Sequence, residues 1–389
     1  MRDGSVDGGW DAVVIGAGVA GGAAAIGLAR AGARVLVVEK ARFPRGKACG
    51  GCLGGVALAE LRRLGLAGEV GRWSRPVERM RLVCGGRSWD WGLPAMAAVR
   101  REALDAALVD AAVSAGAEFR DGCRAEVVDA GDAGRAASVW VGERVVSAEA
   151  VVLADGLGGS GEPGAAAGRW RVAGGSRVGV SMRGSAGEAG EAPRGVRRWV
   201  RGGAVSMAVG RGGYVGAVRM DDGAVHLAGA LDAGMVREHG GAARAVAAVL
   251  SEAGGASVDS ATRDWLANSA WCGAPALTRR RKRVAWGRCL AVGDAAGYVE
   301  PFTGEGMGWA LAAAREASTL VAEVVRDGAW DRLSVWSAVC RAGRGRRWTA
   351  GWVRRAVRRP GLLSAAMRVG AVARPTVGAV LARTHPVSA

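Results

Sequence analysis

Metal-ligating side chains are scarce in this chain of 389 residues. It has only three histidines, and its seven cysteines are scattered along the sequence apart from one pair, Cys49 and Cys52. A structural zinc ion needs four such ligands brought close together, so we expect no metal site. An odd number of cysteines behind an N-terminus that does not resemble a signal peptide also argues against a disulfide framework, and favours reduced thiols in the cytoplasm.

Lysine is nearly absent, because the basic residues are arginines except at Lys40, Lys47 and Lys282. Such a bias, together with 65 glycines, is typical of a GC-rich coding sequence. The formal net charge of +17 is therefore weak evidence for a nucleic-acid-binding surface. The arginine-rich run at residues 279–283 is expected to be a solvated loop, and we expect no nucleic acid partner.

Acidic residues are missing from residue 332 to residue 389, a stretch that holds 12 arginines. We expect residues 329–389 to form a basic, helical C-terminal region. Trp348 and Trp352 would share one helix face there, with arginines flanking it. Two interpretations stay open: the helix lies on an anionic membrane surface as a peripheral contact, or it packs its tryptophans against the rest of the protein.

No segment has the composition of a membrane span. Residues 12–29 form an unbroken run of apolar residues and glycines, but five glycines in 18 residues would make a poor isolated helix. The pattern predicts instead a buried strand over residues 10–15, a glycine turn and a helix to residue 30.

The glycine turn has the G-x-G-x-x-G spacing at Gly16, Gly18 and Gly21. In a strand–turn–helix unit the first glycine permits the tight turn, the second lets a pyrophosphate approach the backbone, and the third lets the helix pack on the strand. A second strand over residues 34–38 ends at Glu39, an acid placed to bind a ribose 2′-hydroxyl. The order of these elements predicts a dinucleotide site for FAD or NAD.

A second unit of this kind lies near residue 290. A strand over residues 289–292 is followed by GDAAGYVEPFTGEGM at 293–307 and by an alanine-rich helix to about residue 325. Asp294 at the strand end suits a polyol hydroxyl, and free N–H groups at the start of a helix suit an electron-rich ring edge. These requirements are those of a flavin.

Four stretches together resemble the FAD-dependent oxidoreductases that include the geranylgeranyl reductases and, more distantly, the hydroxylases of the p-hydroxybenzoate hydroxylase fold. They are the N-terminal fingerprint, FPRGKACGGCL at 43–53, VLADG at 152–156 and VGDAAGYVEPFTGEGM at 292–307. The resemblance implies a mixed α/β fold in which a Rossmann-like FAD-binding domain is built from residues 10–76, 97–172 and 270–328. An antiparallel β-sheet substrate domain would be inserted in it, made of residues 77–96 and 173–269 with strands near 77–91, 176–183, 196–209, 213–219 and 224–231.

The resemblance also implies roles for individual residues. Beyond the N-terminal glycines and Glu39, it implies cofactor binding by Arg101, Asp155, Gly156, Asp294, Pro301, Gly304, Gly306 and Met307. On the substrate side it implies two catalytic candidates, Cys49 in a Cys-Gly-Gly loop and Tyr214. The reductases have a Y-x-W-x-F-P motif around that tyrosine, whereas this chain has GYVGAVRM at 213–220, without the tryptophan and the proline.

The role of Cys52 has two interpretations. It is a small packing residue, or a redox-active thiol whose pKa is lowered by the dipole of a helix from about residue 54. The flavin disulfide reductases use four residues between their cysteines and a second dinucleotide fingerprint, and this chain has neither.

The expected activity is transfer of a hydride from reduced FAD to a double bond of a hydrophobic organic or lipid substrate, with NAD(P)H or another external electron donor. The alternative is a monooxygenase that hydroxylates a small organic or polyketide-type substrate. WDWGLP at 89–94 fits the W-x-W-x-I-P signature of flavin-dependent halogenases with leucine for isoleucine, which makes halogenation a minor alternative. A non-enzymatic protein that binds membranes or nucleic acid is another.

Overall fold

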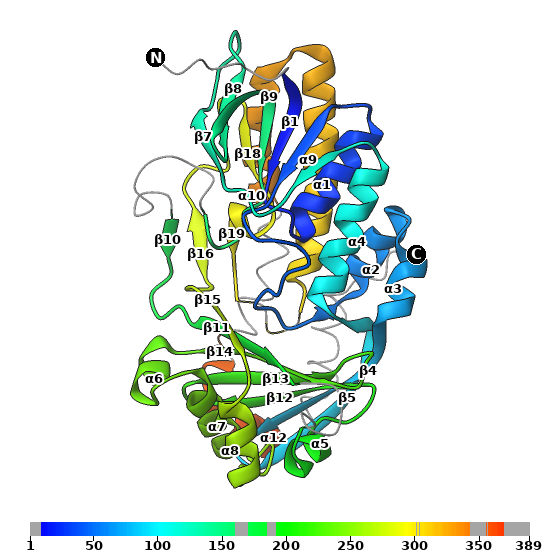
Figure 1. Ribbon diagram of the computed structural model, residues 1–389. Coiled ribbons are helices and arrows are strands. Elements are labelled where there is room, and N and C mark those ends of the chain that lie inside the picture. The colour runs from blue at the N-terminus through cyan, green and yellow to red at the C-terminus, as the bar shows by residue number, and fades with distance from the viewer. Residues whose placement is uncertain are drawn as a thin grey trace.

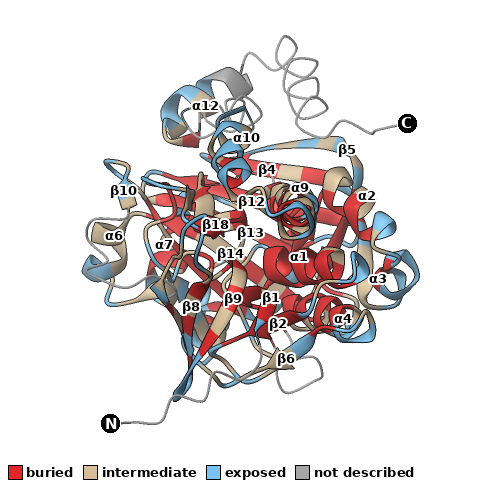
Figure 2. Ribbon diagram, turned by 90° about the horizontal axis from the view of Figure 1, so that it is seen from above, coloured by how far each residue is buried: buried red, intermediate tan, exposed pale blue. Residues whose placement is uncertain are grey.

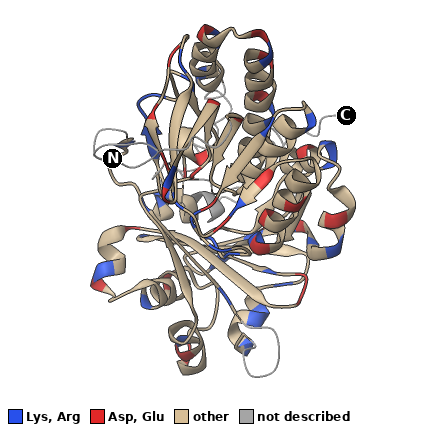
Figure 3. Cartoon of the chain, turned by 45° about the horizontal axis from the view of Figure 1, so that its top comes forward, with Lys and Arg blue, Asp and Glu red and all other residues tan. Residues whose placement is uncertain are grey.

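The computed structural model describes residues 9–159, 170–184, 192–300, 302, 304–342, 355 and 357–368. A mixed α/β upper part lies above a second sheet, which is covered by helices on its lower side (Figure 1). Buried residues concentrate in α1 and in the strands of both sheets (Figure 2). Charged residues of both signs are spread over the outer helices and loops and also lie between the two parts (Figure 3). The predicted mixed α/β fold is confirmed.

The first sheet has parallel strands at its centre. Its order is β17 (Ala285–Trp286), β18 (Cys289–Ala291), β9 (Arg144–Leu153), β1 (Trp10–Ile15), β2 (Val35–Val38) and β6 (Glu118–Arg120), and β7 (Ala125–Asp129) and β8 (Ala137–Val141) extend it beside β9. Strand β1 pairs in parallel with β2 and β9, and β9 pairs in parallel with β18. Because parallel strands end at the same edge, the turns after β1, β2 and β18 lie together.

Three helices cover one face of this sheet: α1 (Val19–Arg30), α4 (Arg101–Ser114) and α9 (Gly306–Asp327). Glycines of α1 permit the close crossings, since a side-chain carbon at Gly22 would lie 2.8 Å from Leu108 Cβ and one at Gly27 would lie 2.3 Å from Ser318 Oγ. The apolar faces of α1 and α9 and the strands between them form one continuous core. This core fixes the N-terminus of α1 against the turn that follows β18.

The second sheet has eight strands, and its order is β15 (Trp271–Ala274), β11 (Val178–Arg183), β14 (Val225–Leu231), β13 (Gly213–Arg219), β12 (Ala204–Gly210), β4 (Ser74–Cys84), β5 (Arg87–Val99) and β3 (Cys52–Leu53). Pairing is antiparallel except between β12 and β4, so the sheet is mixed where a purely antiparallel one was expected. One side packs against α5 (Arg194–Trp199), α7 (Ala242–Ala253) and α8 (Ser260–Ala267), with α6 (Ala233–Glu238) beside α7. The other side faces the first sheet and its helices (Figure 1).

One expected strand is partly wrong. Residues 194–199 form α5, and the strand begins only at Ala204. Pro193 stands just before the first helical residue, where proline is tolerated. Val196 and Trp199 are then buried on one side of the short helix, three residues apart. In a helix, residues three apart lie on the same side, so both side chains are buried beneath the sheet. In a strand they would point to opposite faces.

The arginine run at 279–283 is also not a solvated loop throughout. Strand β16 (Arg279–Arg281) lies between β10 (Trp170–Val172) and β19 (Gly297–Tyr298) in a small third sheet. Arg279 and Arg281 are buried, and their guanidinium carbons lie 5.2 and 5.6 Å from the Trp170 ring centroid. Cation–π stacking on Trp170 therefore places two of the five basic side chains inside the fold.

The remaining elements are α2 (Gly55–Arg63), α3 (Ala67–Trp73), the 3₁₀ turns η2 (Gly293–Ala296) and η3 (Trp330–Val335), α10 (Trp336–Ala342) and α12 (Pro360–Arg368). Trp336 is buried and donates a hydrogen bond from Nε1 to the carbonyl of Ala291 in β18 at 2.8 Å, so α10 packs on the first sheet. Trp348 and Trp352 lie outside the described residues. Within the described part of the chain, no helix is both long and apolar enough to span a bilayer.

Candidate functional site

Two adjoining cavities lie between the sheets. The first is bounded by the loop at residues 47–52, the upper side of the second sheet and the turn before α9, and encloses about 1360 Å³ including its open mouth. The second follows the ends of β1 and β2. Lys47, Asp294 and Tyr298 line both, so the two cavities form one elongated space. Its length and two ends suit an extended ligand with chemically different halves.

The glycine turn after β1 is packed too closely for side chains. Gly16 has a φ of +100°, and a side-chain carbon at Gly21 would lie 1.8 Å from the Gly16 carbonyl oxygen. The N-terminus of α1 is therefore pressed against the end of β1. The first residues of the helix, Val19 and Ala20, line the first cavity, and free N–H groups at a helix N-terminus favour an anion.

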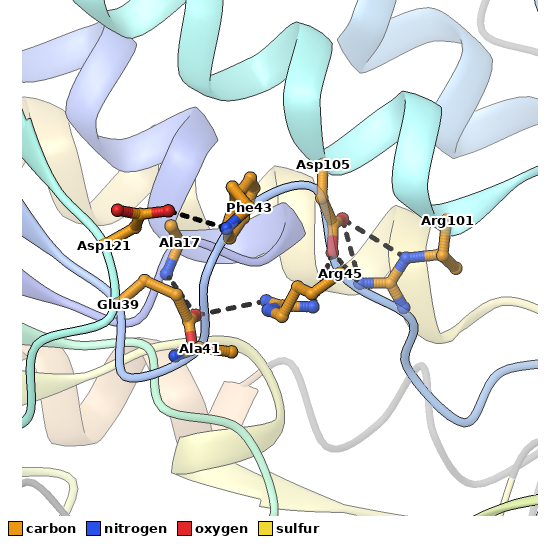
Figure 4. Close-up of polar contacts among 8 residues, drawn as sticks. All are labelled: Ala17, Glu39, Ala41, Phe43, Arg45, Arg101, Asp105 and Asp121. Atoms are coloured by element: carbon orange, nitrogen blue, oxygen red, sulfur yellow. Dashed lines mark hydrogen bonds and ion pairs between the residues drawn. The ribbon is translucent and has the colours of Figure 1, made fainter.

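Glu39 lines the second cavity. Its carboxylate accepts hydrogen bonds from the Ala17 and Ala41 N–H groups, both at 3.1 Å, and pairs with Arg45 at 3.2 Å (Figure 4). Burial disfavours the charged form, but Arg45 and the two N–H groups outweigh burial and lower the pKa of Glu39 below its ordinary value. Glu39 is therefore an ionised acceptor beside the glycine turn.

Three cations converge on Gly18, at the start of α1. A side-chain carbon at Gly18 would lie 3.5 Å from Arg45 Nη2, 3.7 Å from Lys47 Nζ and 3.9 Å from Arg101 Nη2. Arg101 donates three hydrogen bonds to Asp105 at 2.8 to 3.2 Å, and Arg45 donates one at 3.1 Å (Figure 4). Asp105 is fully buried and holds both guanidinium groups in place.

Arg45 and Lys47 were not among the residues predicted to bind the cofactor. Lys47 Nζ also lies 3.1 Å from where a side chain at Gly156 would begin, so it sits between the glycine turn after β1 and the one after β9. Burial, and then the neighbouring charge of Arg101, lower the pKa of Lys47. The sequence did contain a reason to consider Lys47 as a site residue, because it is one of only three lysines in an arginine-rich chain.

The other predicted cofactor residues lie along the same space. Asp294, in η2, and Glu39 both line the second cavity, as does Asp155. Gly156, Gly304, Gly306 and Met307 line the first, with Gly306 as the first residue of α9. Pro301 lies outside the described residues. The residues predicted from the sequence to contact the adenosine, the pyrophosphate and the flavin ring therefore line the two adjoining cavities.

The residues present fit FAD. A cluster of three cations at a helix N-terminus is the donor set that a pyrophosphate needs. Glu39 supplies an acceptor for a ribose at one end, and Asp294 supplies one near the ring end. Gly304 and Gly306 line the first cavity, where the flavin ring is predicted to lie. Binding roles for these residues remain predictions.

Cys49 and Cys52 are both free thiols, and they differ in environment. Cys49 lines the first cavity, and its carbonyl accepts a hydrogen bond from His226 Nε2 at 2.7 Å. Cys52 is buried in β3, and burial together with the neighbouring Cys49 raises its pKa to about 12. Burial therefore keeps Cys52 a thiol at neutral pH, which favours the interpretation of a packing residue.

We expect Cys52 to resist alkylation in the native protein. Treatment with iodoacetamide at pH 8 should label the exposed Cys272 and leave Cys52 unmodified, because only the thiolate reacts. Peptide mass spectrometry measures both sites in one sample. Protein unfolded in urea is the control and should be labelled at both cysteines. Equal labelling of the two in native protein would contradict the buried thiol.

His226 makes stability depend on pH. Burial lowers the pKa of His226, and the hydrogen bond to the Cys49 carbonyl only partly opposes this. The folded state therefore holds a neutral ring, while the unfolded chain binds a proton below about pH 6.5. The free energy of unfolding should fall as the pH drops from 6.5 through the lower folded value.

Urea unfolding at a series of pH values between 7.5 and 5 measures this effect. His226→Gln keeps a donor for the Cys49 carbonyl and removes the titrating group, so its stability should lose that part of the pH dependence. If His226→Gln and the natural protein show the same slope, His226 is not its source.

The chain has only two tyrosines, and both line the first cavity. Tyr214 lies on β13, as predicted for the substrate side, and Tyr298 follows η2. Burial is the main cause that raises the pKa of each well above its ordinary value. Tyr298 was not among the predicted site residues, although the small number of tyrosines in the sequence could have drawn attention to it. All six residues of WDWGLP are described, and none lines either cavity.

Comparisons with known proteins agree with the cofactor site. Residues 10–164 match the FAD binding domain family. A menaquinone reductase of Mycobacterium tuberculosis is 38% identical over 162 residues, which are 39% of this chain and 39% of the relative. A probable electron transfer flavoprotein-quinone oxidoreductase of Escherichia coli is 32% identical over 163 residues, 38% of this chain and 37% of the relative. These matches span well under half the length of either relative.

Solved structures of other proteins align with nearly the whole chain. The structure of the flavin-dependent brominase Bmp2 aligns with a TM-score of 0.73 at 17% identity, covering 97% of this chain and 94% of that one. Identity at this level shows a shared fold alone. The predicted FAD-binding flavoprotein is confirmed over residues 10–164, and a specific membership of the geranylgeranyl reductases is not supported.

Proposed function

We propose that this protein is an FAD-dependent oxidoreductase that reduces a double bond of a hydrophobic organic substrate held in the first cavity. The apolar lining of the first cavity is the main observation that supports the proposal. Its walls on the second sheet are apolar and include Met80, Met96 and Met207. On the opposite side it is bounded by Gly304 and Gly306, where the flavin ring is expected. An apolar substrate would therefore lie directly beside the ring, shielded from water.

When bound and reduced, FAD supplies the hydride. The residues of the chain would bind and orient the cofactor. Arg45, Lys47 and Arg101 would hold the pyrophosphate at the N-terminus of α1, and Glu39 the adenosine ribose. The Tyr298 hydroxyl keeps its proton, because burial raises its pKa, and can donate a hydrogen bond at the junction of the two cavities.

A hydrophobic quinone is the substrate class to test first. The names of two relatives, a menaquinone reductase and a probable electron transfer flavoprotein-quinone oxidoreductase, support it. A polyprenyl chain of geranylgeranyl type is the second class. The electrons would come from NAD(P)H or from another external donor.

Anaerobic turnover tests this proposal. Protein reconstituted with FAD is reduced with NADH, NADPH or dithionite, and menadione or a geranylgeranyl compound is then added. Return of the 450 nm absorbance together with a product heavier by two hydrogens would support it. Reduced protein that neither substrate class reoxidises would contradict it.

Hydroxylation is the second candidate, because Tyr214 places a polar oxygen in an otherwise apolar wall. Such a group would suit a small ring substrate better than a polyprenyl chain. The same protein turned over in air would then form a product heavier by one oxygen, with consumption of NAD(P)H. The two candidates therefore differ in the mass of the product.

A further inference from the structure

A buried cluster of charged residues lies where three segments far apart in the sequence meet. Glu300 is 1% exposed, with Oε1 at 3.4 Å from Arg177 Nη1 and Oε2 at 3.3 Å from Arg358 Nη2. Arg177 directly precedes β11, Glu300 follows β19, and Arg358 lies two residues before α12. The carboxylate therefore connects the second sheet and the C-terminal region to the chain that leads into α9.

Glu300 is held by its backbone as well as by its side chain. Its N–H group donates a hydrogen bond to Thr278 Oγ1 at 3.4 Å. Arg177 is itself 2% exposed and also pairs with Asp232, which follows β14, at 3.2 Å, so it is anchored on the second sheet. The next residue in the sequence is a proline, which disfavours helical backbone at Glu300. The chain at Glu300 therefore has little freedom to move.

The C-terminal region reaches this cluster by packing on the second sheet. Val357 is 3% exposed and belongs to the apolar cluster that includes the cavity wall, and Leu363 packs against the same cluster. Cys84 Sγ, at the end of β4, donates a hydrogen bond to the Pro360 carbonyl at 3.5 Å. Residues on both sides of Arg358 are therefore anchored, and the guanidinium group extends from a fixed backbone.

Phe302 lies two residues after Glu300 and lines the first cavity. Its ring makes an edge contact with Tyr214 on β13, with centroids 5.0 Å apart and ring planes at 76°. The Arg177 guanidinium carbon lies 5.7 Å from the Tyr214 ring centroid. Phe302 is thus connected to the charged cluster through the chain, and Tyr214 through Arg177. Because Gly304 lines the same cavity where the flavin ring is predicted, a ligand ring beside the flavin would lie next to Phe302.

We infer that Arg177, Glu300 and Arg358 form a positioning unit that holds the Phe302 ring in the cavity wall, and that the ring end of an aromatic ligand binds against it. Aromatic pairs gain free energy beyond that of the apolar area they bury, so Phe302 favours a ring over a saturated chain. The inference deepens the proposed function and rests on it for the place of the ligand beside the cofactor. Through Arg358 the C-terminal region contributes to ligand binding, although none of its described residues lines either cavity.

Binding of menadione to the oxidised holoprotein tests the inference without turnover. With no electron donor present, the change in the flavin spectrum near 450 nm gives the Kd of menadione, and a titration of the apoprotein gives the Kd of FAD. Arg358→Gln should weaken menadione binding about fivefold, the size of one aromatic contact. It should leave FAD bound, because Arg177 still pairs with Glu300. Arg358→Lys keeps the charge and should recover part of the affinity. Arg359→Gln, at the exposed neighbouring position, is the matched control and should bind menadione as the natural protein does.

A double-mutant cycle separates positioning from a general loss of stability. Phe302→Leu removes the ring and should itself weaken menadione binding about fivefold. If Arg358 acts through Phe302, the double variant Phe302→Leu with Arg358→Gln should bind menadione no more weakly than Phe302→Leu alone. Two independent effects would instead multiply to about 25-fold. Arg358→Lys takes the place of Arg358→Gln in the cycle if the latter does not fold.

Multiplied effects in the double variant would overturn the inference, and so would an Arg358→Gln protein that binds menadione as the natural protein does. Loss of FAD from Arg358→Gln, or a natural protein whose flavin spectrum does not respond to menadione, would overturn it too. Because oxidised protein is used throughout, these outcomes are independent of the turnover assay. A protein that reduces none of the tested substrates and still shows the coupling of Arg358 with Phe302 would refute the proposed function and leave this inference standing.

Discussion

Gly21→Ala should give protein that purifies without its yellow cofactor. The added methyl carbon would lie 1.8 Å from the Gly16 carbonyl oxygen and 3.1 Å from Ala154 Cβ, so the N-terminus of α1 must move away from β1. Overpacking of this kind costs about 1–3 kcal/mol, and the upper end applies because the close contact is with backbone. The movement also carries Gly18 away from the three cations, so FAD affinity should fall by at least about tenfold, which corresponds to about 1.4 kcal/mol.

The ratio of absorbance at 450 and 280 nm after purification, and a titration of the apoprotein with FAD, measure this effect. Gly71→Ala is the matched control, because Gly71 lies in α3 with no atom within 4 Å of an added carbon. That variant should keep FAD and gain slightly in stability, since alanine favours a helix. Gly21→Ala protein with an unchanged Kd for FAD would refute the role of the close packing.

Arg101→Met should cause the largest loss of stability among single substitutions of charged residues at this site. It removes three of the four hydrogen bonds to Asp105, which is fully buried and would keep only its bond from Arg45. Breaking a buried pair by removing one partner costs about 3–5 kcal/mol. Urea unfolding of the apoprotein measures this loss directly.

A second substitution distinguishes stability from binding. Arg101→Met with Asp105→Asn removes the unpaired charge and should recover much of the stability, but FAD affinity should stay low because one of the three cations near Gly18 is still missing. Arg120→Met, which breaks an ion pair with Glu118 at the surface, is the control and should cost less than about 1 kcal/mol. If the double variant bound FAD as tightly as the natural protein, Arg101 would have no part in the site.

Local patterns predicted the parts of the fold whose causes are local. The strand at residues 10–15 was placed with its observed bounds, and the helices after the two glycine turns were placed close to theirs. An apolar run of strand length followed by spaced glycines has few other ways to fold. The expected strand at 196–209 was partly wrong because the burial of Val196 and Trp199 depends on a sheet built from distant segments.

The sequence by itself determined that this chain has a dinucleotide site, because glycine spacing, strand ends and an acid at Glu39 act within a few tens of residues. Only the tertiary structure decided which other side chains lie beside that site. Arg101 was predicted from the family resemblance, but its meeting with Arg45 and Lys47 at Gly18, and that of Glu300 with Arg177 and Arg358, bridge separations that no short pattern encodes. The physical reason is that long charged side chains take their positions from the packing of the elements that carry them, and this packing is settled by the cores of the two sheets.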